Sequence, residues 1–111
     1  MSFGKMNTVA SICMPWSQTD SEGFAVSSLR IVTLVRVYRE GRHGSTRWAN
    51  LAALSEATDL FRLRSIPGIT IVPGMYLMIG NDRFEILSVE DIKGRGMYLE
   101  LLAKKVVPIH G

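Results

Sequence analysis

Hydrophobic and polar residues alternate with a period of two along most of this chain, which is typical of β-strands. In the C-terminal half, the positions predicted to share a face within each of two successive segments are Met75, Leu77 and Ile79, then Phe84, Ile86 and Ser88. The connections Gly80-Asn81-Asp82 and Lys93-Gly94-Arg95-Gly96 are too short for a crossover helix and contain residues that tolerate positive φ. The pattern therefore predicts antiparallel hairpins over the segments 75–89 and 97–107.

Three further strands are predicted upstream, at Asn7–Trp16, Phe24–Arg39 and Asp59–Ile66. Pro15 has no N–H to donate, so the first strand is expected to end at a sheet edge or in a bend. The polar cluster Ser17–Gly23 predicts a turn. In the second strand, the better candidate core face consists of Leu29, Ile31, Thr33, Val35 and Val37.

The period changes once, between Thr46 and Thr58. Trp48, Leu51 and Leu54 gather there on one side of a helix, and Ser45 or Thr46 offers the N-cap. We therefore expect one short inserted helix.

The faces opposite the candidate core are not polar either, since they carry Tyr76, Met78, Leu87, Val89, Tyr98 and Leu102. A sheet that is apolar on both sides should curl into a barrel or meet a partner. The predicted fold is mainly β, a small antiparallel β-barrel with one short inserted α-helix. At 111 residues it is expected to be a single domain, 1–111, with flexible ends at 1–6 and 108–111.

Composition narrows the function classes. Cys13 is the one cysteine, so no internal disulfide is expected, and with His43 and His110 it gives no metal-ligand spacing. The sequence shows neither a secretory signal nor an apolar run long enough to span a bilayer, which predicts a protein made in a cytoplasm and no membrane partner.

Candidate chemistry is sparse. His43 lies between Gly41 and Gly44 in a basic loop, and Ser45 is better explained as a cap than as a nucleophile. The carboxylates Glu85, Glu90, Asp91 and Glu100 are expected to face solvent and guard strand edges. We predict no catalytic, cofactor-binding or metal site and no enzymatic activity.

A basic loop is the clearest charged feature of the sequence, although the net charge is only +3. Its candidate functional residues are Arg39, Arg42, His43 and Arg47. In a ring of subunits they would form a charged collar that contacts DNA phosphates without reading sequence. A solvated loop, or one that docks on an acidic patch of the next subunit, explains the same residues.

The C-terminal half resembles the head-tail joining family of tailed bacteriophages, also called head closure or head completion proteins. The resemblance runs from Phe61 to Lys105 and rests on three motifs: Arg-x-Arg-x-x-Pro-Gly-Ile-x-x-x-Pro-Gly-Met, Asp-Arg-Phe-Glu-Ile-Leu-Ser-Val-x-Asp and Gly-Arg-x-x-Tyr-Leu-Glu-Leu. The first half departs from the family pattern, with Val35-Arg36-Val37-Tyr38 where a Trp-Ala pair is common.

The resemblance implies a structural protein of the virion neck, assembled in the bacterial cytoplasm. Its implied partners are the portal or adaptor ring, tail proteins and further copies of itself in a ring, with non-specific DNA contact in the channel. Arg62 and Arg64 are then candidates for the subunit interface. The alternative is a small OB- or SH3-like barrel that binds nucleic acid through the arginines and through Tyr38, Tyr76 and Tyr98.

Overall fold

The computed structural model describes residues 8–19, 22–23, 25–41, 56–94 and 96–106. Six strands make up this part of the chain: β1 Thr8–Thr19, β2 Ala25–Gly41, β3 Asp59–Arg64, β4 Tyr76–Ile79, β5 Asp82–Asp91 and β6 Tyr98–Val106, with one 3-10 turn at Ile92–Gly94. The predicted mainly β, antiparallel class is confirmed. The predicted flexible ends fall outside the described residues.

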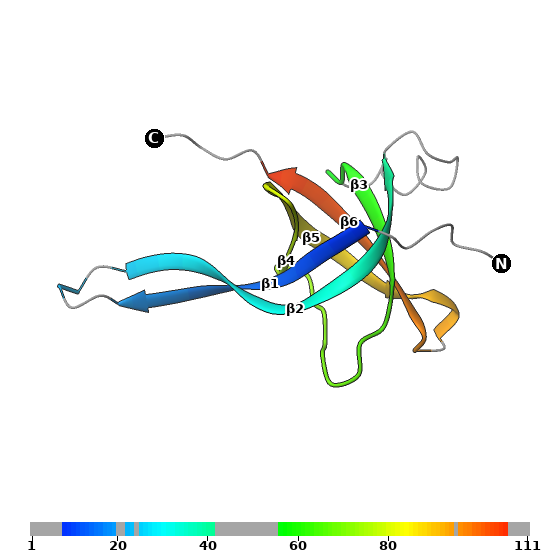
Figure 1. The fold of residues 1–111 in the computed structure, drawn as a ribbon, viewed down its shortest axis with the longest axis horizontal. Helices are drawn as coiled ribbons and strands as arrows, with labels where there is room; N and C mark the ends of the chain where they lie inside the picture. The colour runs from blue at the N-terminus through cyan, green and yellow to red at the C-terminus, as the bar shows by residue number, and fades with distance from the viewer. Residues whose placement is uncertain (1–7, 20–21, 24, 42–55, 95, 107–111) are drawn as a thin grey trace.

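The strands form one antiparallel sheet in the order β1-β2-β3-β6-β5-β4, and β4 pairs with β1, so the sheet closes on itself. The two C-terminal hairpins form as predicted, β4 with β5 and β5 with β6 (Figure 1). In the second hairpin the turn requires left-handed backbone at both Lys93 (φ 60°) and Gly94 (φ 61°). The carboxylate of Asp91 accepts the Gly96 N–H at 2.9 and 3.0 Å, which fixes the far side of this turn.

The helix predicted at Thr46–Thr58 falls almost wholly outside the described residues. Only its last three residues, 56–58, are described, and they are not helical. The described structure therefore gives the inserted helix no support.

A two-stranded arm extends from the closed sheet, and it corrects the predicted end of the first strand. β1 continues through Pro15 to Thr19 and pairs with β2 as far as Ala25, so Ser17–Thr19 of the polar cluster lie in a strand, and Glu22 and Gly23 lie in a turn. β4 pairs with β1 only at Ser11–Cys13. Pro15 is thus on a strand with an open side, where its missing N–H is tolerated, as the sheet-edge prediction requires. We call the segments Met14–Thr19 and Ala25–Arg30 the arm; Figure 1 shows them reaching away from the other strands.

Two β-bulges change which residues face the core. Pairing shifts from Ile12 with Thr33 to Cys13 with Ile31, so Val32 is an extra residue in β2. Val35, Val37 and Val32 pack in or against the core, whereas Ile31, which the simple alternation placed inside, is 61% exposed.

The second bulge inserts Leu87 into β5, between the pairs Ile86 with Ala103 and Ser88 with Leu102. Phe84 and Ile86 share one face as predicted, and that face is the core face. Ser88, predicted on the same face, is exposed, and Val89 packs against the core instead. Alternation before the bulge cannot be carried across it, because the inserted residue moves the following side chains to the other face.

The interior of the closed sheet is filled by one apolar cluster. Its fully buried large side chains include Phe61 and Phe84, whose rings meet edge to face with centroids 5.1 Å apart. A smaller cluster outside this core joins Ala57 and Leu60 with Leu87 and Leu102. The apolar residues on the inner face of the sheet therefore form the main core, and Leu87 and Leu102 on the other face pack in the smaller cluster.

Candidate assembly surfaces

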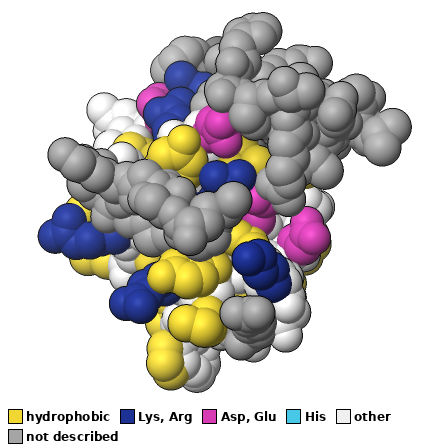
Figure 2. Space-filling view, turned by 90° about the vertical axis from the view of Figure 1, so that its right-hand side faces the viewer, with side chains coloured by type: hydrophobic (Ala, Val, Ile, Leu, Met, Phe, Trp, Pro, Cys, Tyr) yellow, Lys and Arg dark blue, Asp and Glu magenta, His cyan; other side chains and the backbone are white. Residues whose placement is uncertain are grey.

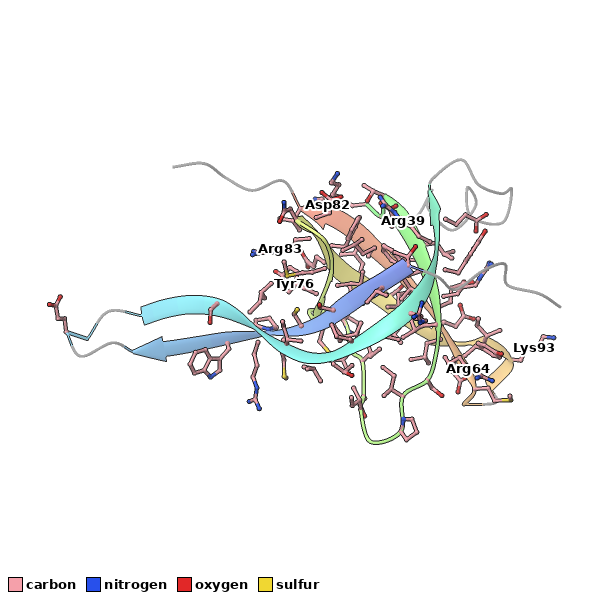
Figure 3. All side chains as sticks on the ribbon, in the orientation of Figure 1. Arg39, Arg64, Tyr76, Asp82, Arg83 and Lys93 are labelled. Carbon is pink, nitrogen blue, oxygen red and sulfur yellow. The ribbon has the colours of Figure 1, made fainter. Side chains whose placement is uncertain are left out.

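Arg39 lies near the end of β2, and its exposed side chain is held against the closed sheet. It pairs in register with Phe61, an interior residue, and its guanidinium lies 5.0 Å from the centroid of the Phe84 ring. Nε of Arg39 donates to Oδ2 of Asp59 at 2.8 Å, and Oδ1 of Asp59 accepts the Thr58 hydroxyl at 2.8 Å. This ion pair lies beside Phe84 at one end of the core, and Figure 3 labels the position of Arg39.

The remaining members of the predicted basic collar, Arg42, His43 and Arg47, lie outside the described residues. Arg39 is thus the one member that the structure places. Its partner Asp59, 6% exposed, was not anticipated. In the sequence, Asp59 begins β3 and stands directly before its first apolar residues. Its pairing with the arginine-containing end of β2 appears only in the structure.

Arg62 and Arg64 follow one another on the outer face of β3, but their surroundings differ. Nε of Arg62 lies 3.0 Å from Oε2 of Glu100 on β6, and the two side chains are 17% and 3% exposed. Arg64 is exposed, and its guanidinium lies 5.7 Å from the centroid of Tyr98. Arg62 is therefore a structural residue of this chain, whereas Arg64 presents charge to the surroundings.

Glu100 corrects the expectation that the C-terminal carboxylates face solvent. It is buried, although it pairs in register with the exposed Glu90. The Arg62 guanidinium offsets the cost of placing this carboxylate out of water. Arg62 and Glu100 meet because β3 pairs with β6. The sequence of one strand alone does not show which strand lies beside it, so the burial of Glu100 could not be predicted.

The tyrosines do not form an open stacking platform. Arg62 lies over the ring of Tyr38 at 5.7 Å, and Arg64 lies over Tyr98. Each of these rings thus already carries a guanidinium near its face. Tyr76, on β4, lies well apart from Arg64 (Figure 3).

Basic side chains are dispersed on the end of the molecule seen in Figure 2, where hydrophobic and acidic side chains lie between them. On this face the described residues form no continuous basic patch of the kind that tracks a nucleic-acid backbone.

Large apolar side chains, by contrast, are exposed on the arm and beside it. Met14 and Trp16 on the arm are 46% and 48% exposed, and Ile31 and Leu34 on the adjoining part of β2 are 61% and 64% exposed. Val9, also on β1, is 50% exposed, and Val72 and Met97 are exposed outside these two strands. Several exposed apolar side chains along two paired strands are typical of a contact surface.

In the part of the chain that is described, no three His, Cys, Asp or Glu side chains gather closely enough to hold a metal ion. Cys13 is fully buried; burial raises the pKa of its thiol, and the positive charge of Arg83 lowers it by a smaller amount. The described residues contain no helix that is long and apolar enough to cross a bilayer.

These features define a small, closed antiparallel β protein with an apolar arm and paired internal charges, a class suited to contacts with other proteins. A sequence model of the phage head completion protein family matches residues 1–106, and the chain belongs to this family. No curated protein matches it. Among solved structures, a chain described as "Virion of native gene transfer agent (GTA) particle" is similar, with a TM-score of 0.58 and 19% sequence identity over 92% of this chain and 96% of the other. At that identity the likeness shows the fold alone.

Proposed function

We propose that this protein is a structural subunit of the neck of a tailed phage-like particle, where it joins the DNA-filled head to the tail. The observation that carries the proposal is the family match over residues 1–106, which spans nearly the whole chain. The solved relative, a virion protein, agrees with a role inside a particle. No reaction is part of this role.

The arm supports the proposal physically. A two-stranded hairpin without a third strand is only marginally stable in water, and this one exposes Met14 and Trp16. Neighbouring subunits that cover the arm would remove its apolar surface from water and would support both strands. Such an arm favours a subunit that completes its packing on assembly.

The finer assignment is a ring of subunits around the DNA channel, with portal or adaptor proteins on one side and tail proteins on the other. In this arrangement Arg39 anchors the start of the basic loop to Asp59, and the loop residues Arg42, His43 and Arg47 line or close the channel. Their contact with DNA would be electrostatic and independent of sequence. Arg64, exposed on β3, belongs to a surface that contacts a neighbouring protein of the neck.

Complementation tests the neck role. Heads assembled without this chain are incubated with the purified protein and then with tails, and tailed particles are counted by electron microscopy. We expect joining to depend on the added protein, and a labelled copy to appear at the head-tail junction. Equal joining with and without it, or label elsewhere in the particle, would contradict the proposal.

A salt titration tests the channel loop against the nucleic-acid-binding alternative. The isolated chain is titrated with short duplex DNA at about 50 and about 200 mM salt. We expect weak binding, because a single loop supplies few phosphate contacts. Micromolar binding that falls steeply with salt would instead support an OB- or SH3-like nucleic-acid barrel.

A further inference from the structure

The wall of the closed sheet opens between β2 and β3, because these two strands pair only over Tyr38–Gly41 and Asp59–Arg62. Beyond those pairs a hollow of about 420 Å³ lies between Leu34–Arg36 of β2 and Arg64–Pro67. We call this hollow the β2–β3 groove.

Two arginines border the β2–β3 groove on its outer side. The last ladder pair is Tyr38 with Arg62, and extending that register by two residues places Arg36 in line with Arg64. Both side chains are exposed. Within the described chain, neither forms an ion pair, whereas Arg39 and Arg62 on the same two strands each have a carboxylate within 3.0 Å. The groove therefore presents two cations whose charge is not balanced by a bonded acid.

The inner side of the groove is apolar. Val35 and Ile66 are partly buried and pack against the core cluster, and Leu34 lies exposed at the rim. A side chain entering here from outside would meet hydrocarbon on the inner side and guanidinium groups on the outer side.

The β2 edge along the groove also has hydrogen-bonding capacity. β2 residues up to Val37 pair with β1, and the ladder with β3 begins only at Tyr38. In an antiparallel ladder every second residue directs its N–H and C=O away from its partner strand. Those groups of β2 are available to an added strand, as in recognition by β-augmentation.

We propose that the β2–β3 groove binds an extended acidic segment of a neighbouring neck protein, which adds to β2 as a strand. The alternation of a strand matches the two sides of the groove: carboxylates at every second position point outward to Arg36 and Arg64, and apolar residues between them point inward to Val35 and Ile66. The groove itself indicates an acidic, alternating segment as the partner. Only the statement that the segment belongs to a neck protein rests on the proposed function.

Peptide titration of the isotope-labelled full chain, followed by NMR of its backbone amides, tests the proposal. The probe is a blocked peptide of about eight residues that alternates Glu and Val, and the comparison peptide alternates Gln and Val. We expect saturable shifts confined to Leu34–Val37 and Arg64–Ile66, with the Gln peptide at least about tenfold weaker.

Charge-matched variants identify the groove as the site. Arg36→Gln combined with Arg64→Gln should weaken Glu-peptide binding by about tenfold or more, because both outward cations are lost. Arg30→Gln with Arg83→Gln removes the same net charge from exposed positions outside the groove and should change binding less than about twofold. Unchanged amide spectra away from each substitution check that the variants fold.

Three outcomes would overturn the proposal: no shifts at millimolar peptide, equal binding of the Gln peptide, or equal weakening by both double variants. Displacement of the peptide by short DNA at lower concentration would assign the groove to phosphate instead. Concentration-dependent shifts of the same amides without peptide would assign it to a second copy of this chain. Complementation of heads remains a separate readout, so failed peptide binding with successful joining leaves the neck role intact.

Discussion

The closed sheet and the arm use the same two strands in opposite ways. In the closed sheet, β1 pairs with β2 and β4, β2 pairs first with β1 and then with β3, and Ile12 and Val37 are fully buried. On the arm the strands have only each other, and Trp16 is nearly half exposed. Strand formation here therefore does not depend on local burial: one continuous hairpin is built into a core at one end and left for a partner at the other.

The largest expected effect on stability comes from Phe84→Ala in the core of the closed sheet. The ring is fully buried and packs edge to face on Phe61, so truncation removes apolar contacts and leaves a cavity. We expect a loss of about 4 kcal/mol in the free energy of unfolding, measured by urea denaturation. A loss below about 1 kcal/mol would show that the interior is not the main source of stability.

The internal ion pair gives the next largest effect. Glu100→Ala removes the carboxylate that lies 3.0 Å from Arg62 in a mostly buried setting, with an expected cost of about 3 kcal/mol. The matched control is Glu56→Ala, which breaks the exposed pair with Lys104 at 3.1 Å and should cost at most about 0.5 kcal/mol. Similar costs for the two substitutions would contradict the distinction between buried and surface pairs.

The turn between β5 and β6 allows a purely backbone test. Gly94→Ala places a Cβ at φ 61°, although no atom lies within 4 Å of that position, and should cost about 1 kcal/mol. Lys93→Ala keeps a Cβ at φ 60° and should be nearly neutral. Thermal unfolding of both variants measures the difference in stability. A neutral Gly94→Ala would contradict the expected cost of a side chain in left-handed backbone.

The smallest effect on stability is expected on the arm. Trp16→Ser should change the free energy of unfolding by less than about 0.5 kcal/mol, because the indole is nearly half exposed and lies outside the core cluster. The same variant should reduce tail joining in the complementation assay if the arm is an assembly surface. A large loss of stability with normal joining would reverse the roles assigned to the arm and the closed sheet.

Much of the fold could be predicted from local patterns. Positive-φ turn residues predict the β4–β5 and β5–β6 hairpins, and period-two alternation predicts the core positions Phe84 and Ile86, because turn chemistry and strand parity act over a few residues. The family resemblance over Phe61–Lys105 likewise rests on motifs that are local in sequence and is confirmed by the family match.

Tertiary structure decided what depends on neighbours distant in sequence. The bulges at Val32 and Leu87 reversed the faces of Ile31 and Ser88, because an extra residue is defined only by the partner strand. Arg62 became internal and Arg64 external because Glu100 lies across the ladder from the first and the open groove lies beside the second. Local patterns predicted most of the strands, the two C-terminal turns and the family resemblance. Pairing between distant strands determined which charges are neutralised inside the chain and which remain for a partner, since burial and electrostatic compensation depend on three-dimensional proximity.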